Sequence, residues 1–444
     1  GIEMEADKPG WYDALNGLPG LLGSSTSEMF ELRRYAQFLL DAFNELGLDD
    51  YYEVSLFDEL GEFIKRLSEI LEKEQEPLAY WRAANDVKES YRLSVRKGIR
   101  GDEEGISVGN LRTFLQRVID RTHMAENRAK QKNGLVATYY MFEVLSYEHL
   151  PQSHDGKQNV MPTLFKASAL PLFLEGIVHM LKVTRDLYEA KKIYHAVRQS
   201  GLFDQKLKMY KVNEDLSAQN EDIGRARVFP RGWLENESIW LHMEYKYILE
   251  LLRVGLYQEF VETFDDVLVP FLDPAVYGRS TLENSSFLVS SAHEDESLHG
   301  QGFVARLSGS TAEMLHIWLW MNIGQNPFVV NHQKQLCLQF DPTLSRALFI
   351  SSPQTFGRIN RAGRWEDVKL PAHTYAFHFL ASTLVVYHNP KSLDIRPDSD
   401  YQVERIVLTL LNGQEHVFTD GFIPAPHAQR VREGGADRID VHFV

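Results

Sequence analysis

The sequence predicts an α+β protein in which a large helical part is followed by a smaller β domain. Within residues 27–323, segment after segment repeats apolar side chains at helical spacing. Residues 326–444 instead alternate apolar and polar side chains between Pro, Gly, Asn and Asp turns, for example over 383–387 and 405–410. Successive helical hairpins followed by strands indicate an α-toroid capped by an antiparallel β-sandwich, with residues 1–325 in the first domain and 326–444 in the second.

Helices are expected wherever an apolar stripe recurs between a start signal such as Pro77 and a stop signal such as Gly47. The expected helical ranges are 27–46, 54–71, 77–97, 110–132, 168–183, 185–199, 238–254, 256–267 and 310–323. Residues 101–105 are expected to form a loop, 135–146 a strand or an irregular insert, and 207–212 a short strand. About nine or ten helices can therefore be counted before Gly324.

Composition narrows the class of protein. The 444 residues are 44% hydrophobic and 25% charged, the range of globular proteins, and the net charge is −15. An acidic balance argues against a nucleic acid or an anionic membrane as partner. The single cysteine, Cys337, excludes an intrachain disulfide and favours a reducing, cytoplasmic setting. No apolar run approaches the roughly 18–20 residues that span a bilayer, and no signal peptide is visible.

The acidic and imidazole side chains of residues 293–299 are the one candidate for a metal cluster. They follow one another on a loop instead of recurring at helical spacing: His293, Glu294, Asp295, Glu296 and His299. This spacing does not suit a tetrahedral ligand set. We therefore expect no metal and no organic cofactor.

Residues 9–16 contain the first candidate catalytic group. Asp13 follows Trp11 and Tyr12 and precedes a Gly/Pro turn. Because a carboxyl group set among aromatic rings is poorly solvated, its protonated form is favoured, and Asp13 is a candidate proton donor. The alternative is an ordinary surface turn.

Two further segments carry polar groups at the start of a predicted helix. Residues 224–242 combine arginines, Glu235, Glu237 and His242, and residues 308–311 read Ser-Gly-Ser-Thr. Hydroxyl, imidazole and backbone N–H groups at helix N-termini suit an anion or a sugar. The alternatives are a surface loop with internal ion pairs and a plain Ser/Thr N-cap.

Together these segments resemble the glycoside hydrolase family 94 phosphorylases. Residues 11–16 resemble the family's Trp-Asn-Asp-Gly-Met-Asn segment, 235–242 its Glu-Asn-Gly-Gly-(aliphatic)-Phe-x-His segment, and 307–312 its Tyr-Thr-Gly-Ser-Ala segment. Residues 276–277 match its Tyr-Val-Tyr loop, and 385–390 its Glu-Val-x-Asn-Pro segment. Order and approximate spacing agree over nearly the whole chain. The long β-glucan phosphorylases of families 149 and 161 share this architecture, so the subfamily stays open.

The resemblance implies an (α/α)6 barrel with a C-terminal β domain, and inverting phosphorolysis of β-linked gluco-oligosaccharides to α-glucose 1-phosphate. Asp13 would protonate the leaving oxygen while inorganic phosphate, the co-substrate, attacks the opposite face of the sugar. His242, Ser308 and Gly309 would hold the phosphate. Substrate-binding residues would be Trp11, Tyr12, Glu235 and Tyr277. An inverting hydrolase needs a second carboxylate to activate water, whereas phosphate is itself the nucleophile and needs donors to hold it.

The sequence departs from the family in three places. Glu237 and Ser238 replace the two glycines, Glu313 replaces an aromatic residue, and only 12 residues precede Asp13 where the family has further barrel helices and a sugar-binding Arg-Asp pair. We therefore expect another chain, or another segment of a precursor, to complete the barrel; a homodimer is a further option. Two alternatives stay open: an inverting hydrolase with Glu237 or Glu235 as base, and a non-catalytic glycan-binding subunit.

Overall fold

The computed structural model describes residues 1–5, 10–73, 76–153, 155–304 and 308–444, without the side chain of Ser308. It is a mixed α+β structure, as the sequence predicts. The chain divides into two compact units, one of Gly1–Glu244 with Phe287–Gln301 and one of Tyr245–Ser286 with Gly302–Val444. The helix α7 (Leu241–Arg253) contains a boundary between them. Helices α8 and α10 thus belong to the same unit as the C-terminal strands.

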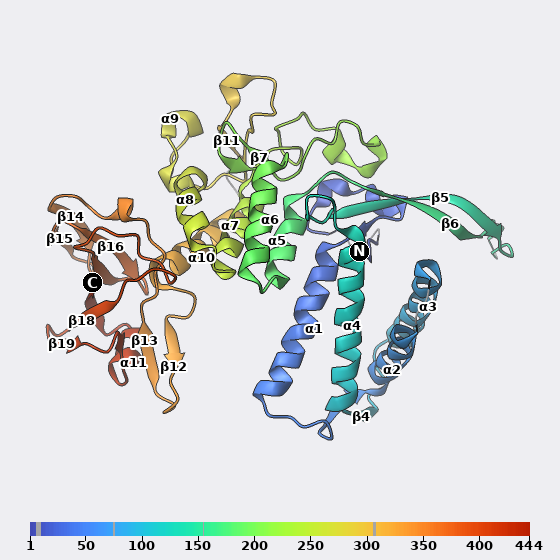
Figure 1. The fold of residues 1–444 in the computed structure, drawn as a ribbon, viewed down its shortest axis with the longest axis horizontal. Helices are drawn as coiled ribbons and strands as arrows, with labels where there is room; N and C mark the ends of the chain where they lie inside the picture. The colour runs from blue at the N-terminus through green and yellow to red at the C-terminus, as the bar shows by residue number, and fades with distance from the viewer. Residues whose placement is uncertain (6–9, 74–75, 154, 305–307) are drawn as a thin grey trace. The chain divides into compact units, whose positions relative to one another are not determined.

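The first unit contains long amphipathic helices. They are α1 (Ser27–Glu45), α2 (Asp58–Glu72), α3 (Pro77–Val95), α4 (Val108–Ala129), α5 (Leu174–Val183) and α6 (Leu187–Gln199). Helices α1 and α4 lie side by side (Figure 1) because Ala36 meets Leu115, Val118 and Ile119 in an apolar cluster. The sequence places α1, α3, α4 and α6 correctly to within a few residues.

Three local predictions for this unit are wrong. Residues 54–57, expected as helix, belong to β3 (Glu53–Phe57). This strand pairs with β4 (Glu103–Ser107), which includes residues 103–105 of the expected loop. Val54 and Leu56 turn to one side of the hairpin, an alternation that was hidden inside a longer apolar pattern. Residues 168–173 are not helical either: β6 (Val160–Ala169) ends at Ala169, and α5 begins only at Leu174, beyond Pro171.

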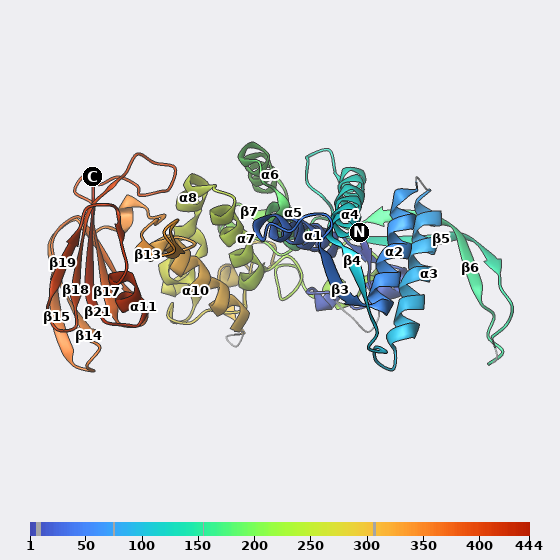
Figure 2. The same ribbon diagram turned by 90° about the horizontal axis from the view of Figure 1, so that it is seen from below.

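The strands of the first unit form one four-stranded sheet and several short pairs. β5 (Tyr139–His149) and β6 form a long hairpin that extends beyond the helices of the unit (Figures 1 and 2). The short strands β1 (Ile2–Glu3) and β2 (Ser24–Ser25) join its base in the order β1-β2-β5-β6. The remaining pairs are β7 (Phe203–Asp204) with β8 (Met209–Tyr210) and β9 (Ile239–Trp240) with β10 (Phe287–Leu288). The strand predicted over 207–212 is thus present but shorter.

The second unit combines helices with the C-terminal sheets. Its helices are α8 (Tyr257–Val267), α9 (Pro274–Tyr277), α10 (Ser308–Ile323) and α11 (His427–Arg432). Its strands are β11 (Gly302–Phe303), β12 (Phe328–Val330), β13 (Leu336–Gln339), β14 (Gln354–Ile359), β15 (Trp365–Leu370), β16 (Thr374–Phe379), β17 (Thr383–His388), β18 (Val403–Leu410), β19 (Glu415–Phe418), β20 (Phe422–Ile423) and β21 (Ala436–Phe443).

The β structure predicted after Gly324 is confirmed, with one correction. The largest sheet has the order β16-β17-β21-β18-β19, and Figure 2 shows β17, β21, β18 and β19 side by side. β17 and β21 pair in parallel, so this sheet is mixed and not antiparallel throughout. β17 is buried on both faces, from Thr383 to Tyr387, as is usual for a central strand. The Tyr387 hydroxyl donates to the carbonyl of Asn322, 2.6 Å away, which attaches the end of α10 to the sheet.

Candidate functional site

The turn that carries Asp13 is fixed by its neighbours. Asp13 begins a 3-10 helix, η1 (Asp13–Leu15), whose Ala14 and Leu15 are buried. The adjacent Tyr12 is 1% exposed, and its ring meets Phe173 edge to face at 5.0 Å between centroids. The Tyr12 hydroxyl donates to the carbonyl of Glu235 and lies 3.2 Å from Asn213 Oδ1. Tyr12 therefore anchors the turn from its buried side.

A second short helix, η4 (Arg225–Arg227), lies directly against η1. The Arg225 N–H donates to Asn16 Oδ1 at 3.1 Å. Gly17, just after η1, donates its N–H to the carbonyl of Ile223 at 3.2 Å, in the short helix η3 (Glu221–Ile223) that precedes η4. Gly17 and Gly224 make this approach possible. A Cβ atom at Gly17 would lie 1.9 Å from the Asp222 carbonyl oxygen, and one at Gly224 would lie 2.5 Å from the Ala14 carbonyl oxygen. The spacing of the two turns is thus set by their backbones.

Asp13, Arg225 and Glu235 form one charged cluster between these turns. Arg225 Nη2 lies 2.9 Å from Asp13 Oδ2 and 3.9 Å from Glu235 Oε1. Glu235 Oε2 accepts the Ala14 N–H at 3.0 Å, so the Glu235 carboxyl group is held beside Asp13. The side chain of Glu235 is 12% exposed, that of Asp13 58% and that of Arg225 46%. Two carboxyl groups in unequal surroundings are the arrangement that separates an acid from a base.

The Glu235 carboxyl group, and not Asp13, is the buried member of the pair. Burial, followed by repulsion from Asp13 and a hydrogen bond with it, raises the pKa of Glu235 to about 7 from its usual 4.5. The Ala14 N–H and Arg225 oppose this rise. The expectation that aromatic rings enclose the Asp13 carboxyl group is wrong, because that group is exposed and paired with Arg225. Burial thus favours the protonated form of Glu235.

Glu235→Gln should flatten the dependence of stability on pH. The folded protein binds the Glu235 proton more tightly than the unfolded chain does. The resulting stabilisation is therefore complete below pH 4.5 and is lost as the pH rises to about 7. Urea unfolding at half-unit pH steps would measure this slope in the wild type and in the variant. Glu189→Gln, an exposed control on α6, should keep the wild-type slope; a wild-type slope in Glu235→Gln would contradict the assignment.

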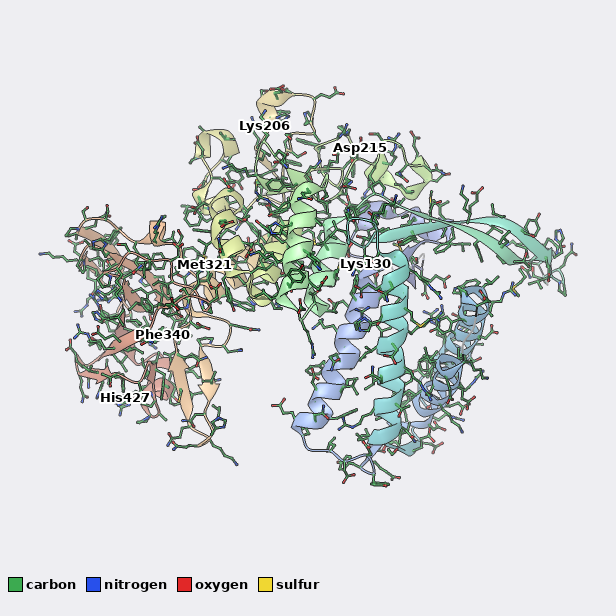
Figure 3. The ribbon with its side chains drawn as sticks, viewed as in Figure 1. Lys130, Lys206, Asp215, Met321, Phe340 and His427 are labelled. Carbon is green, nitrogen blue, oxygen red and sulfur yellow. The ribbon has the colours of Figure 1, made fainter. Side chains whose placement is uncertain are left out.

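Glu237 is held in ion pairs and is not a free carboxylate. Its side chain is 1% exposed, with Lys211 Nζ at 2.8 Å and Arg231 Nε at 2.5 Å. Arg231 also approaches Asp215, labelled in Figure 3, at 3.4 Å. The Glu237 backbone is left-handed, with φ 56°, which is a conformation that favours glycine. Glycine is the residue that the resembled motif has at this position.

Aromatic rings extend the site from Trp11 towards His242. The Trp11 ring lies 4.2 Å from the Trp240 ring and 5.5 Å from the His242 ring, between centroids. His242 is half-buried in the first turn of α7. The structure thus brings together Trp11, Tyr12, Asp13, Glu235 and His242, five of the residues that the sequence predicts.

The other predicted residues belong to the second unit. The buried Tyr277 hydroxyl donates to the Glu283 carbonyl at 2.8 Å and accepts the Ser285 N–H at 2.8 Å, so it supports its own loop. Ser308 and Gly309 begin α10, and Gly309 is half-buried. The Ser308 side chain and the preceding residues 305–307 of the resembled motif lie outside the described residues.

Sequence reasoning missed two members of the site. Arg225 stood among several arginines of one loop, with nothing in its spacing to mark it as the partner of Asp13. Asn213 lies outside every motif, yet its Oδ1 accepts the Glu237 N–H at 3.0 Å and lies within hydrogen-bond distance of the Tyr12 hydroxyl. Only the folded chain brings residues 12, 213 and 237 together.

Comparison with known proteins leaves the class of protein to be argued from the site. No model of a known protein family matches the chain, and no curated protein matches it either. Over the part of the chain that is described, no group of three or more His, Cys, Asp or Glu side chains is placed to hold a metal ion. In the same part of the chain, none of the helices is long and apolar enough to cross a membrane.

Proposed function

We propose that this chain carries the acid site of an inverting phosphorylase that cleaves β-linked gluco-oligosaccharides and releases α-glucose 1-phosphate. The single observation that carries the proposal is the pair of Asp13, an exposed carboxyl group, and Glu235, a buried one, which lie 2.9 Å and 3.9 Å from the same nitrogen of Arg225. Both acids lie in segments that resemble family 94 phosphorylases. The proposal includes that family's (α/α)6 barrel, and a cytoplasmic setting for the buried, unpaired Cys337.

In this mechanism Asp13, the exposed acid, faces the substrate. It donates a proton to the glycosidic oxygen as the bond to the anomeric carbon breaks. A phosphate oxygen attacks that carbon from the opposite face, with His242, Ser308 and Gly309 as the proposed phosphate ligands. Trp11 offers an apolar ring surface to a sugar, and Tyr12 anchors the turn that carries Asp13. Tyr277, a further proposed substrate-binding residue, supports its own loop in the second unit.

The hydrolase alternative has less support from the geometry. A general base must accept a proton from water, but both oxygens of Glu237 already face cations, Lys211 and Arg231. Glu235 as base would need to be ionised, whereas its surroundings favour the protonated form. Phosphate needs no such base, and phosphorolysis is therefore the better account. The non-catalytic alternative does not explain why a buried carboxyl group is held beside an exposed one at the same guanidinium group.

Product formation from β-gluco-oligosaccharides should depend on phosphate. We expect α-glucose 1-phosphate when the protein, together with any segment that completes its barrel, is incubated with laminari-, sophoro- or cello-oligosaccharides and inorganic phosphate. Nuclear magnetic resonance would identify the product and its anomeric configuration. Omitting phosphate is the matched control. Free glucose formed at the same rate without phosphate would establish the hydrolase instead, and no product from any of the three linkages would favour a glycan-binding role.

A further inference from the structure

The hairpin of β14 and β15 has one face attached to the C-terminal sheet and one face in solvent. On the inner face, Leu370 packs with Leu384 and Val386 of β17, and Arg358 Nη2 lies 3.0 Å from Asp437 Oδ1 at the start of β21. The outer face consists of residues 355, 357, 359, 365, 367 and 369, and all six are exposed. Side chains of this outer face can therefore meet a ligand without any change in the hairpin.

The indole ring of Trp365 lies over Gly357 on this outer face. A Cβ atom at Gly357 would lie 1.8 Å from Cζ2 of Trp365 and 2.5 Å from Cη2, so the ring occupies the place of the missing side chain. The Trp365 Nε1–H donates to Asp367 Oδ1 at 3.3 Å, which fixes the direction of the ring. One side of the ring thus meets the strand, yet the side chain is 69% exposed, and its other side is open to solvent.

Polar groups continue the outer face away from the ring. Two residues along β15 from Asp367 comes Lys369, which pairs with Thr355 of β14. From Trp365 to Lys369 the strand rises about 13 Å, a length that more than one linked sugar ring can follow. An open hollow of about 370 Å³ adjoins the Thr355–Lys369 pair at the open end of the hairpin. The outer face thus offers an aromatic ring, then a carboxylate, then an ammonium and a hydroxyl group.

This combination of groups suits a neutral sugar chain. A β-glucosyl ring has equatorial hydroxyl groups, so its faces present C–H groups that pack on an aromatic ring, while its rim bonds to charged side chains. The Asp367 carboxylate at the edge of the indole ring repels an anionic ligand such as a nucleotide. The apolar side chains of the outer face are Trp365 and Ile359, a patch too small for a stable protein interface.

We propose that the outer face of the β14–β15 hairpin is a second glycan-binding site, which takes a β-linked glucan chain across Trp365 towards Lys369. The site lies in the second unit and takes no part in bond cleavage. The choice of a β-glucan as its ligand rests on the proposed phosphorolysis, whereas the site itself does not. A second site of this kind keeps a long glucan at a high local concentration after each release from the first.

Fluorine nuclear magnetic resonance of the full chain tests the proposal at the site itself. The 7 tryptophans are labelled as 5-fluorotryptophan, and Trp365→Phe identifies the Trp365 signal by its loss. Titration with laminari-, sophoro- and cellohexaose, without phosphate, should shift this signal saturably with at least one of the three. A Trp365 signal that stays unchanged with all three, up to their solubility, would overturn the proposal.

Variants that keep Trp365 as the probe separate the site from its surroundings. Gly357→Ala puts a methyl group where the ring lies and should weaken glycan binding about fivefold or more. Phe356→Ala is the matched control, because it removes an aromatic side chain, 46% exposed, from the inner face of the same strand and should keep the wild-type affinity. Equal affinities of the wild type and Gly357→Ala, or equal losses in both variants, would contradict the site.

Two further measurements cover a loosened hairpin and a different occupant. Asp367→Asn leaves the ring over Gly357 and should still weaken binding severalfold, through the loss of charge-assisted hydrogen bonds. An unchanged affinity in Asp367→Asn would count against the polar part of the site. Sedimentation of Trp365→Ala should give the wild-type oligomeric state, and a shift to smaller species would assign this face to a second copy of the chain instead of a glycan.

Failure of this inference can be told from failure of the proposed function. Trp365→Ala should release glucose 1-phosphate from a disaccharide at the wild-type rate, and a large loss would place Trp365 in the active site. A protein that forms glucose 1-phosphate without any glycan-dependent shift at Trp365 keeps the function and loses the inference. A shift at Trp365 without any glucose 1-phosphate keeps the second site and loses the function.

Discussion

Asp13→Asn is expected to lower kcat for phosphorolysis of an unactivated oligosaccharide on the order of 10²–10⁴-fold, the usual effect of removing a general acid. Asparagine keeps the shape of the side chain but cannot supply the proton. The Arg225 contact changes from an ion pair to a hydrogen bond, while η1 keeps its buried anchors, Ala14 and Leu15. Steady-state rates of glucose 1-phosphate release would measure the loss.

Two controls make this result specific to acid catalysis. A substrate whose leaving group needs no protonation, such as an aryl glucoside with an acidic phenol, should lose far less activity in Asp13→Asn. Asp120→Asn changes an exposed aspartate of α4 and should behave as the wild type. Activity within a few-fold of the wild type on the unactivated oligosaccharide would remove Asp13 from the mechanism.

Glu237→Gln is expected to destabilise the first unit by roughly 3 kcal/mol, the effect of breaking a buried ion pair from one side. Its carboxylate is 1% exposed, and the Lys211 side chain that faces it is 12% exposed, so the change leaves a buried cation without its counter-charge. Because Arg231 is 47% exposed and can turn to water, it adds less to the loss. Thermal and urea unfolding would measure the change.

The matched control is the same substitution in an exposed pair. Glu189 and Lys192 lie 2.8 Å apart on α6, both about half exposed, and such pairs contribute little, so Glu189→Gln should leave stability nearly unchanged. Wild-type stability together with a complete loss of activity in Glu237→Gln would contradict the structural role and restore Glu237 as the base of a hydrolase.

Local sequence pattern accounts for most of the helices but not for the partner of the acid. An apolar stripe with a proline or a glycine at its end defines α1 and α3, because both signals are local. The strand β3 was missed because its alternation merges into the helical stripe that follows. The pairing of Asp13 with Arg225 depends on a contact across more than two hundred residues, and no periodicity encodes such a contact.

In the candidate site, too, the sequence indicates the residue types but not their surroundings in the folded protein. Motif spacing identified Asp13, Glu235 and His242 as chemically active residue types. It predicted a poorly solvated carboxyl group at Asp13, because Trp11 and Tyr12 precede it. In the structure the Tyr12 ring packs against Phe173 in the interior and leaves the Asp13 carboxyl group exposed. The Glu235 carboxyl group is the buried one. Such a difference depends on solvent access, which residue types alone do not specify.

The close contact of η1 with η4 has a consequence for attempts to redesign this protein. Because a Cβ atom at Gly17 or at Gly224 would meet the backbone of the facing segment, a larger residue at either position would force the two segments apart. A library that varies these turns should therefore keep both glycines, whatever chemistry it is meant to introduce. Useful variation lies instead in exposed side chains of the two turns. New substrate preferences could be selected there while Asp13 and Arg225 stay in contact.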